Sequence, residues 1–429
     1  MNVSMGPGNR VIIFLGLLLV TACQGPAYGA WRPLPGGAVE LSPSEPPDGV
    51  LYKLDCEWQF LPGVFVDPAD RSAWQSAIPV RLPAEWNQLK TAKHSFADGR
   101  GIGSYRLRIQ LPAKHFSARQ ALMYRAVLSA HRLYVNGILH YESGQAGPTA
   151  VTTIPHYGIA YVPLLTGSQQ NQSSGDAVEL LFHVANFNHR TGGISDSVII
   201  GPQRVVLLSV LSSIMTGVFI SGVLLIMGLY HIGLWLARPA DKPALLFGLF
   251  CLVISGRVYV TGQMFFAHQW LGLDFATIRR LDYLSVYFGA LFFCSFIIQL
   301  FGSSKKAVWH GLVQALIWPF VLFILVRDPY HFSFDMLRFQ YVLLLLAVLT
   351  LSIQIYALQQ KRSGAGLSLL GSLILIGGTV NDILYARNLL LFGQVIQYAV
   401  TGFVLLQSIT LARGFASTHQ RAERMSERL

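Results

Sequence analysis

The C-terminal half of the chain, residues 205–413, is almost continuously apolar. Only 12% of the 429 residues are charged, whereas a soluble domain carries about 25% charged residues. A helix needs about 20 apolar residues to cross the hydrocarbon core of a bilayer. Seven stretches are close to that length: residues 208–234, 244–263, 281–301, 307–326, 339–358, 366–386 and 391–411. The sequence therefore predicts a membrane protein with an α-helical seven-transmembrane bundle in residues 205–413.

Residues 1–29 are typical of a secretory signal peptide. Arg10 precedes a short apolar run, residues 11–20, which is too short to span a bilayer and has the length of a signal core. Val20-Thr21-Ala22-Cys23 is similar to a lipobox and predicts lipidation of Cys23, whereas Ala27 fits ordinary cleavage after Gly29. An uncleaved anchor is a third interpretation. The first two predict that the domain behind the signal is exported.

Charged loop residues orient the bundle, because Lys and Arg gather in the cytoplasmic loops of bacterial membrane proteins. Basic residues fall in alternate predicted loops and in the tail: Arg238, Lys242, Lys305, Lys306, Lys361, Arg362, Arg413, Arg421, Arg424 and Arg428. An exported N-terminal domain and a cytoplasmic tail require an odd number of helices, which favours seven over six or eight. The net charge of +11 then reflects orientation and not nucleic-acid binding. We predict a multi-pass protein of the bacterial inner membrane with a periplasmic N-terminal domain.

Residues 31–204 carry the pattern of a β-rich domain. Hydrophobic and polar residues alternate in residues 104–111 and 178–186, as in half-buried strands. Residues 132–135 run into Asn136-Gly137, which accepts the positive φ angles of a type I′ hairpin turn. Short strands at close spacing predict a periplasmic β-sandwich or jelly roll.

Six short motifs follow one another in this domain: Glu57-Trp58-Gln59-Phe60, Leu82-Pro83-Ala84-Glu85-Trp86, Gly101-Ile102-Gly103-Ser104-Tyr105-Arg106, Leu133-Tyr134-Val135-Asn136-Gly137, Val184-Ala185-Asn186 and Gly192-Gly193-Ile194. Their order resembles the galactose-binding-like jelly roll at the start of family 2 glycoside hydrolases. Together with seven helices, the chain resembles the seven-transmembrane receptors with diverse intracellular signalling modules. The resemblance implies a periplasmic domain that binds a ligand, with carbohydrate as one ligand class.

Several side chains of this domain are candidates for ligand contact. Trp86 and Tyr105 could stack on a sugar ring, and Trp86 is the better surface candidate because it follows Pro83. Arg106 shares a strand face with Arg108 and could bind an anion. The remaining candidates lie in one polar loop: Asn186, Asn188, His189 and Arg190. The alternatives are a core position for Tyr105, arginines that face water, and a solvated loop.

Four polar residues near the outer ends of the predicted spans form a candidate intramembrane cluster: Arg257, Asp282, Asn381 and Asp382. Charge inside a bilayer is costly and is usually paired or functional. We predict that Arg257 pairs with Asp282 or Asp382. The pair is either a static structural contact or part of a cluster that ligand binding rearranges.

Short catalytic motifs are missing from the sequence, including G-x-x-x-x-G-K-[ST] and HExxH, which mark phosphate-binding loops and metalloproteases. We predict no enzyme, no metal and no cofactor. Members of the resembling family usually continue into a kinase or cyclase, whereas only residues 414–429 follow the last span here. The resemblance thus implies an effector in trans. A heptad-like stripe in this helical tail favours a homodimer, and a basic tail at the headgroups is the alternative.

The sequence therefore predicts a receptor that binds an envelope or extracellular ligand and signals through a shift between two bundle arrangements. Its predicted partners are the lipid bilayer, a glycan or other small envelope ligand, and a cytoplasmic effector. Two other functions stay open: a transporter with an accessory carbohydrate-binding domain, and an envelope-assembly subunit. No inverted repeat is evident, which counts against transport.

Overall fold

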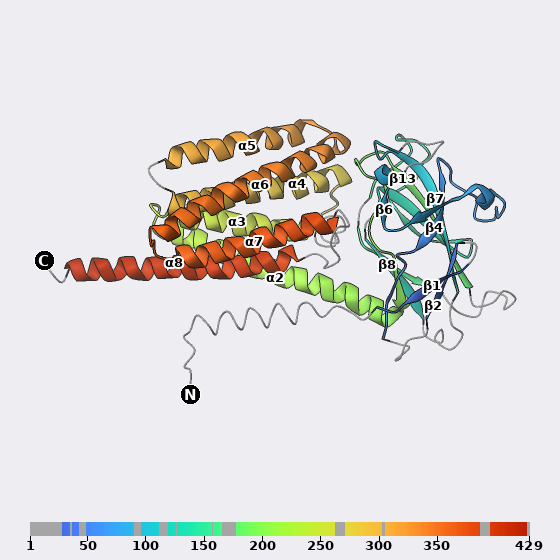
Figure 1. The fold of residues 1–429 in the computed structure, drawn as a ribbon, viewed down its shortest axis with the longest axis horizontal. Helices are drawn as coiled ribbons and strands as arrows, with labels where there is room; N and C mark the ends of the chain where they lie inside the picture. The colour runs from blue at the N-terminus through green and yellow to red at the C-terminus, as the bar shows by residue number, and fades with distance from the viewer. Residues whose placement is uncertain are drawn as a thin grey trace.

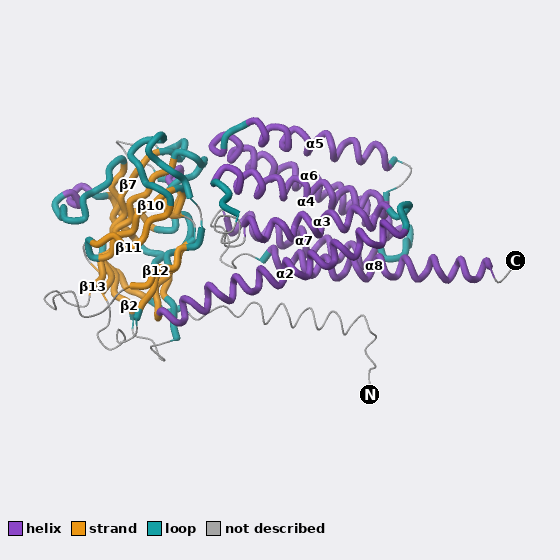
Figure 2. Tube along the Cα trace, turned by 180° about the vertical axis from the view of Figure 1, so that it is seen from behind, coloured by secondary structure: helices purple, strands orange, loops and turns teal. Residues whose placement is uncertain are grey.

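The computed structural model describes residues 28–34, 37–42, 49–89, 96–110, 119–125, 127–156, 158–164, 177–261, 271–302, 305–386 and 395–426. A β-rich domain lies at one end of a long helical bundle (Figure 1, Figure 2). The predicted fold class is confirmed, because a β-sandwich precedes a bundle of apolar helices. The predicted signal peptide lies outside the described residues except for its last two, and Cys23 lies outside them as well.

The described part of the β-domain forms three sheets. The strands are β1 (Trp31–Leu34), β2 (Ala38–Leu41), β3 (Tyr52–Lys53), β4 (Glu57–Pro62), β5 (Ile78–Arg81), β6 (Ala84–Glu85), β7 (Gly101–Gln110), β8 (Gln120–Tyr124), β9 (Val127–Leu128), β10 (Ala130–Val135), β11 (Ile138–Ser143), β12 (Ala160–Leu164), β13 (Ala177–Asn186), β14 (Gly193–Ile194) and β15 (Ile199–Pro202). The largest sheet has the order β1-β2-β7-β13-β10-β11, with β4 and β5 attached through β7. The other two sheets have the orders β12-β8-β15-β3 and β6-β14-β9.

The two larger sheets pack face to face around an aromatic core. Trp58 and Phe182 come from the largest sheet, and Tyr124 and Ile200 come from the second sheet. The ring of Phe182 lies 5.2 Å from that of Tyr124 and 5.9 Å from that of Trp58. Asn136-Gly137 turns β10 into β11 with positive φ at both residues, as predicted.

The bundle contains α2 (Gln203–Ala237), α3 (Lys242–Thr261), α4 (Phe275–Phe301), α5 (Lys306–Val326), α6 (Pro329–Gln359), α7 (Ala365–Ala386) and α8 (Ile396–Ser426). Among the described residues, 6 helices, α2 to α7, are long and apolar enough to cross a membrane. The apolar part of α8, Ile396–Ala412, is shorter. The C-terminal end of α8 lies at the end of the bundle away from the β-domain (Figure 1).

Helix α6 begins at Pro329, well before the predicted start at residue 339. Asp328 caps the helix by accepting a hydrogen bond of 3.0 Å from the backbone N–H of His331, and proline suits the first helical turn. The prediction missed this start because Asp335 and Arg338 interrupt the apolar run. In the structure these two side chains pair at 2.8 Å, so the helix tolerates both charges.

The β-domain continues into the bundle without a linker, because β15 ends at Pro202 and α2 begins at Gln203. Val206 and Val210 on the first turns of α2 are buried against the second sheet. Their neighbours there include Ala121 and Met123 of β8. This packing fixes the direction in which α2 leaves the sheet.

Candidate functional site at the domain junction

Trp86 and Tyr105, the predicted sugar-stacking residues, are both fully buried, with 0% exposure. The indole N–H of Trp86 donates a hydrogen bond of 2.6 Å to the Tyr105 hydroxyl. A Cβ on Gly192 would collide with the Trp86 ring, so the glycine backbone passes directly over the indole. The prediction that Trp86 lies at the surface is therefore wrong, because a loop distant in sequence covers it.

The guanidinium group of Arg106 also has its binding partners within the β-domain. Its Nε donates to Gln59 Oε1 at 2.9 Å, and its guanidinium lies 4.5 Å from the centre of the Trp74 ring. Glu179 lies 3.9 Å from Arg106 and 2.9 Å from Arg108, so the two arginines share a strand face as predicted. With 6% exposure, Arg106 offers little surface to an anionic ligand.

The polar loop of residues 186–191, which we call the junction loop, is shaped by the buried Asn186. Its side-chain N–H₂ donates to the carbonyl oxygens of Gly99 at 2.7 Å, His189 at 2.7 Å and Thr191 at 3.1 Å. Its Oδ1 accepts a hydrogen bond of 3.2 Å from the His189 N–H. A Cβ on Gly99, where φ is +74°, would collide with the backbone of Arg190. Asn186 thus determines the loop conformation and has little capacity left for a ligand.

The other predicted residues of the junction loop differ in environment. His189 is buried, and its Nδ1 accepts a hydrogen bond of 3.2 Å from the Thr191 N–H. Asn188 is half-buried, and its Oδ1 has no hydrogen-bond partner among the described residues. The backbone carbonyl of Arg190 accepts a hydrogen bond of 3.0 Å from Asn87. Hydrogen bonds within the β-domain therefore hold the backbone of the loop.

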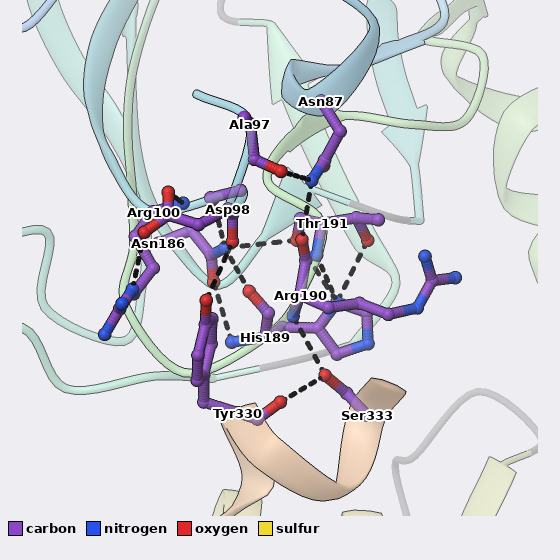
Figure 3. A network of polar contacts seen from close by, with 11 residues as sticks. Asn87, Ala97, Asp98, Arg100, Asn186, His189, Arg190, Thr191, Tyr330 and Ser333 are labelled. Atoms are coloured by element: carbon purple, nitrogen blue, oxygen red, sulfur yellow. Dashed lines mark hydrogen bonds and ion pairs between the residues drawn. The ribbon is translucent and has the colours of Figure 1, made fainter. Parts of the chain in front are cut away.

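The junction loop docks on the first turn of α6 (Figure 3). The Arg190 N–H donates to Ser333 Oγ at 3.0 Å, and Ser333 Oγ donates to the Tyr330 carbonyl at 2.6 Å. The Tyr330 hydroxyl donates to the Asp98 carbonyl at 3.3 Å. The Arg100 guanidinium lies 4.2 Å from the centre of the Tyr330 ring, which is cation–π geometry. The β-domain thus contacts α6 through two of its loops, the junction loop and the loop that contains Asp98 and Arg100.

The same loop borders an intramembrane polar cluster, defined here as Arg257, Arg279, Asp282 and Ser285. One guanidinium nitrogen of Arg257 donates to Asp282 Oδ1 at 2.6 Å, to the Asp282 carbonyl at 2.7 Å and to Ser285 Oγ at 2.9 Å. Arg279 reaches the other carboxylate oxygen of Asp282 at 3.2 Å. After burial, the positive charge of Arg279 is the largest cause that lowers the pKa of His189. One carboxylate therefore neutralises two arginines beside the junction loop.

Arg257 pairs with Asp282, which is one of the two partners predicted for it. Asp382 instead accepts backbone N–H groups at the start of α8, from Val395 at 2.8 Å and Ile396 at 3.4 Å. Asn381 donates to the same carboxylate at 3.1 Å. A carboxylate favours the N-terminus of a helix because the N–H groups there lack partners within the helix. Asp382 therefore links α7 to α8, and in the part of the chain that the structure describes it is not the partner of Arg257.

Sequence reasoning missed Tyr330, Ser333 and Arg100, which make the contact with α6. Asp328-Pro329 was a readable helix-start signal that would have placed Tyr330 and Ser333 on the first turn of α6. The spacing of Arg279 and Asp282 on one helix was a second readable signal. Nothing in the sequence indicates that Arg100 lies over Tyr330.

Three buried histidines predict acid sensitivity of the β-domain. Burial lowers the pKa of His131 to about 3, of His183 to about 4 and of His189 to about 3. In an unfolded chain the pKa of histidine is about 6.5. Between the folded and the unfolded pKa values, the unfolded chain binds more protons than the folded chain. The free energy of unfolding is therefore highest above about pH 6.5 and falls as the pH decreases toward 4. Thermal unfolding of the full chain followed by tryptophan fluorescence should show this decrease, and His183→Gln should reduce its slope. A midpoint that is constant from pH 7 to 4.5 would contradict the prediction.

Residues 213–413 match a family model described as 7TM diverse intracellular signalling. Among solved structures, the chain is similar to a β-glucuronidase of Faecalibacterium prausnitzii, at 16% identity and TM-score 0.28 over 35% of this chain and 31% of that chain. It is also similar to a glycosyl hydrolase family 2 member from Bacteroides cellulosilyticus, at 13% identity and TM-score 0.28 over 35% and 20%. The chain thus spans less than a third of the length of these enzymes, and a likeness this distant does not bear on what it binds. No curated protein matches the chain.

Proposed function

We propose a signalling route for this chain. Its helical domain belongs to the 7TM diverse intracellular signalling family, and the chain is therefore a transmembrane receptor. The route begins in the β-domain, passes through the junction loop and reaches α6 and the polar cluster. The contact between the Arg190 N–H and Ser333 Oγ is the observation that carries the proposal. It joins the β-domain to a membrane helix at a point distant in sequence from the covalent link to α2.

A ligand can shift a receptor only by binding one of its arrangements more tightly than another. The junction loop lies between β13 and β14. β14 pairs with both β6 and β9. A ligand that moves these strands also moves the backbone that contacts Ser333. The Asp282 carboxylate lies between two arginines from different helices, so a small displacement of Arg279 would change the pairing of Arg257.

The finer assignments are part of the same proposal. The ligand is an envelope or extracellular molecule, and carbohydrate is the class that the resemblance of the sequence motifs favours. Because Trp86, Tyr105 and Arg106 are buried in this arrangement, we infer that the first contact with ligand uses other surfaces of the β-domain. The loop charges support a periplasmic β-domain and a cytoplasmic tail, where a kinase or cyclase would receive the signal in trans. Pairing of two chains through residues 414–429 stays a prediction.

A transport path fits the geometry less well. Such a path would use Arg257, Asp282 and Asp382 together. Arg257 instead pairs with Asp282, while Asp382 binds the start of α8. We therefore do not propose transport.

The proposal predicts that Ser333→Ala uncouples the two domains without abolishing ligand binding. A panel of peptidoglycan fragments and oligosaccharides would be screened for a thermal shift of the full chain in nanodiscs. Hydrogen exchange would then be measured with each binding compound. Loss of one hydrogen bond costs about 1 kcal/mol, or about fivefold in coupling. We expect the ligand-dependent change in exchange at the start of α6 to shrink, while the affinity changes little.

Ser352→Ala is the matched control, because Ser352 lies on the same helix and donates only a local hydrogen bond of 2.7 Å to the Val348 carbonyl. It should respond to the compound as the parent chain does. A Ser333→Ala variant whose α6 responds fully would contradict the route through the junction loop.

A further inference from the structure

The end of α5 and the start of α6 lie at the end of the bundle beside the β-domain (Figure 1), and two arginines there share one carboxylate. Arg327, which follows α5, donates to Asp335 Oδ2 at 3.3 Å, and Arg338 on α6 donates to Asp335 Oδ1 at 2.8 Å. The Asp335 side chain is 5% exposed, whereas those of Arg327 and Arg338 are 43% and 69% exposed. These two residues, which we call the arginine pair, therefore present positive charge at the surface above one buried counter-charge.

The other charged groups at this place do not cancel the excess. Arg280 adds a positive charge, because its Nη2 donates to the Arg327 carbonyl at 3.3 Å. Asp328 is the other acidic residue here, and its carboxylate accepts a hydrogen bond of 3.0 Å from the His331 N–H and lies 2.9 Å from the His331 ring. Counted with Asp335, two carboxylates face three arginines. The surface therefore keeps a net positive charge.

The surface around the arginine pair is apolar. On α5, Val326 is 83% exposed, and the guanidinium of the neighbouring arginine lies 4.8 Å from the centre of the Phe323 ring. On α6, Tyr341 and Leu345 are exposed, and their spacing puts them on the same face as Arg338. Both helices are long and apolar enough to cross a membrane. The arginine pair therefore lies where a lipid-facing apolar surface ends.

The chemistry of this surface determines which ligand fits it. A charge on a lipid-facing surface is costly unless it is neutralised. A guanidinium group has five N–H donors, and its planar fork matches the oxygen atoms of a phosphate. At the end of an apolar span, the phosphate within reach is that of a phospholipid. A zwitterionic headgroup carries its own ammonium group, so the net positive charge of the surface favours an anionic phospholipid.

We propose that Arg327 and Arg338 bind the phosphate of an anionic phospholipid, whose acyl chains lie along the exposed apolar side chains of α5 and α6. Asp335 orients both guanidinium groups from below, because each carboxylate oxygen accepts from one arginine. The bound phosphate then links α5 to α6 beside the link through Asp335. The site does not include Ser333 or the junction loop, so it stands apart from the proposed signalling route.

Native mass spectrometry of the full chain in detergent, titrated with phosphatidylglycerol or with phosphatidylcholine, tests the site. We expect one phosphatidylglycerol to bind more tightly than phosphatidylcholine. Arg327→Gln and Arg338→Gln should each weaken its binding about fivefold, the contribution of one basic residue beside anionic lipid. Arg238→Gln is the matched control, because Arg238 is exposed in the turn after α2 at the other end of the bundle. Equal affinity for the two lipids would overturn the proposal, and so would equal losses in Arg338→Gln and Arg238→Gln.

Asp335→Asn gives a test in the opposite direction. It removes the carboxylate that competes with the lipid phosphate for both arginines, so the affinity for phosphatidylglycerol should rise. If the three residues only formed a structural ion pair, the substitution would bring no gain in lipid affinity, and that result would contradict the site. Soluble glycerol phosphate should not displace the lipid, because it lacks acyl chains. Full displacement at an equal concentration would assign the site to free phosphate and overturn the lipid assignment.

Discussion

Asp282→Asn should be among the most damaging substitutions in the bundle. The Asp282 side chain is 9% exposed and neutralises Arg257 at 2.6 Å and Arg279 at 3.2 Å. Asparagine keeps the shape but leaves the two guanidinium groups without a counter-charge. Removing one partner of a buried ion pair costs about 3–5 kcal/mol. We expect the unfolding midpoint of the full chain in nanodiscs to fall by roughly 10 °C.

Asp241→Asn is the matched control, because Asp241 lies in the turn between α2 and α3 and makes no ion pair among the described residues. It should leave the midpoint unchanged. A double-mutant cycle with Arg257→Met and Asp282→Met should give a coupling energy of about 1 kcal/mol or more, since the groups are in direct contact. Fully additive effects would mean that the pair does not form in the membrane.

The intramembrane charges were readable from the sequence, but their pairing was not. Arg257, Asp282 and Asp382 interrupt apolar runs, so each was recognisable as an intramembrane charge. Sequence gives the depth of a residue along its helix and not its direction around the bundle axis. Asp282 and Asp382 therefore looked equivalent as partners of Arg257. The structure separates them because Asp382 faces the first turn of α8.

The candidate ligand site shows the same limit within the β-domain. Alternation predicted the long strands β7 and β13, and Asn136-Gly137 predicted the hairpin, because both signals are local. Exposure of Trp86 depends on Gly192 and Gly193, which lie far along the chain and cover the indole. A local pattern cannot indicate such coverage. Asn186 was predicted to be a ligand residue because it is polar. Its side-chain N–H₂ group instead donates hydrogen bonds to three carbonyl oxygens of the protein.

Asn186→Asp should disrupt the junction loop while changing the side-chain shape least. The Asn186 N–H₂ group donates to three carbonyl oxygens, at Gly99, His189 and Thr191. A carboxylate cannot donate, so it would place a buried negative charge against three carbonyl dipoles. Leaving buried groups unsatisfied costs about 1–3 kcal/mol each. We expect a stability loss of about 3 kcal/mol or more and faster hydrogen exchange across residues 186–191.

The effect should also reach the bundle, because the loop places the Arg190 N–H on Ser333. Exchange at the start of α6 should therefore rise in Asn186→Asp, whereas the far end of α6 should not respond. Gln75→Glu makes the same change from amide to carboxylate at an exposed position of the β-domain, so it should alter neither segment. If Asn186→Asp loosened the loop and left the start of α6 unchanged, the β-domain would be coupled to the membrane through α2 instead, and the junction loop would not carry the signal.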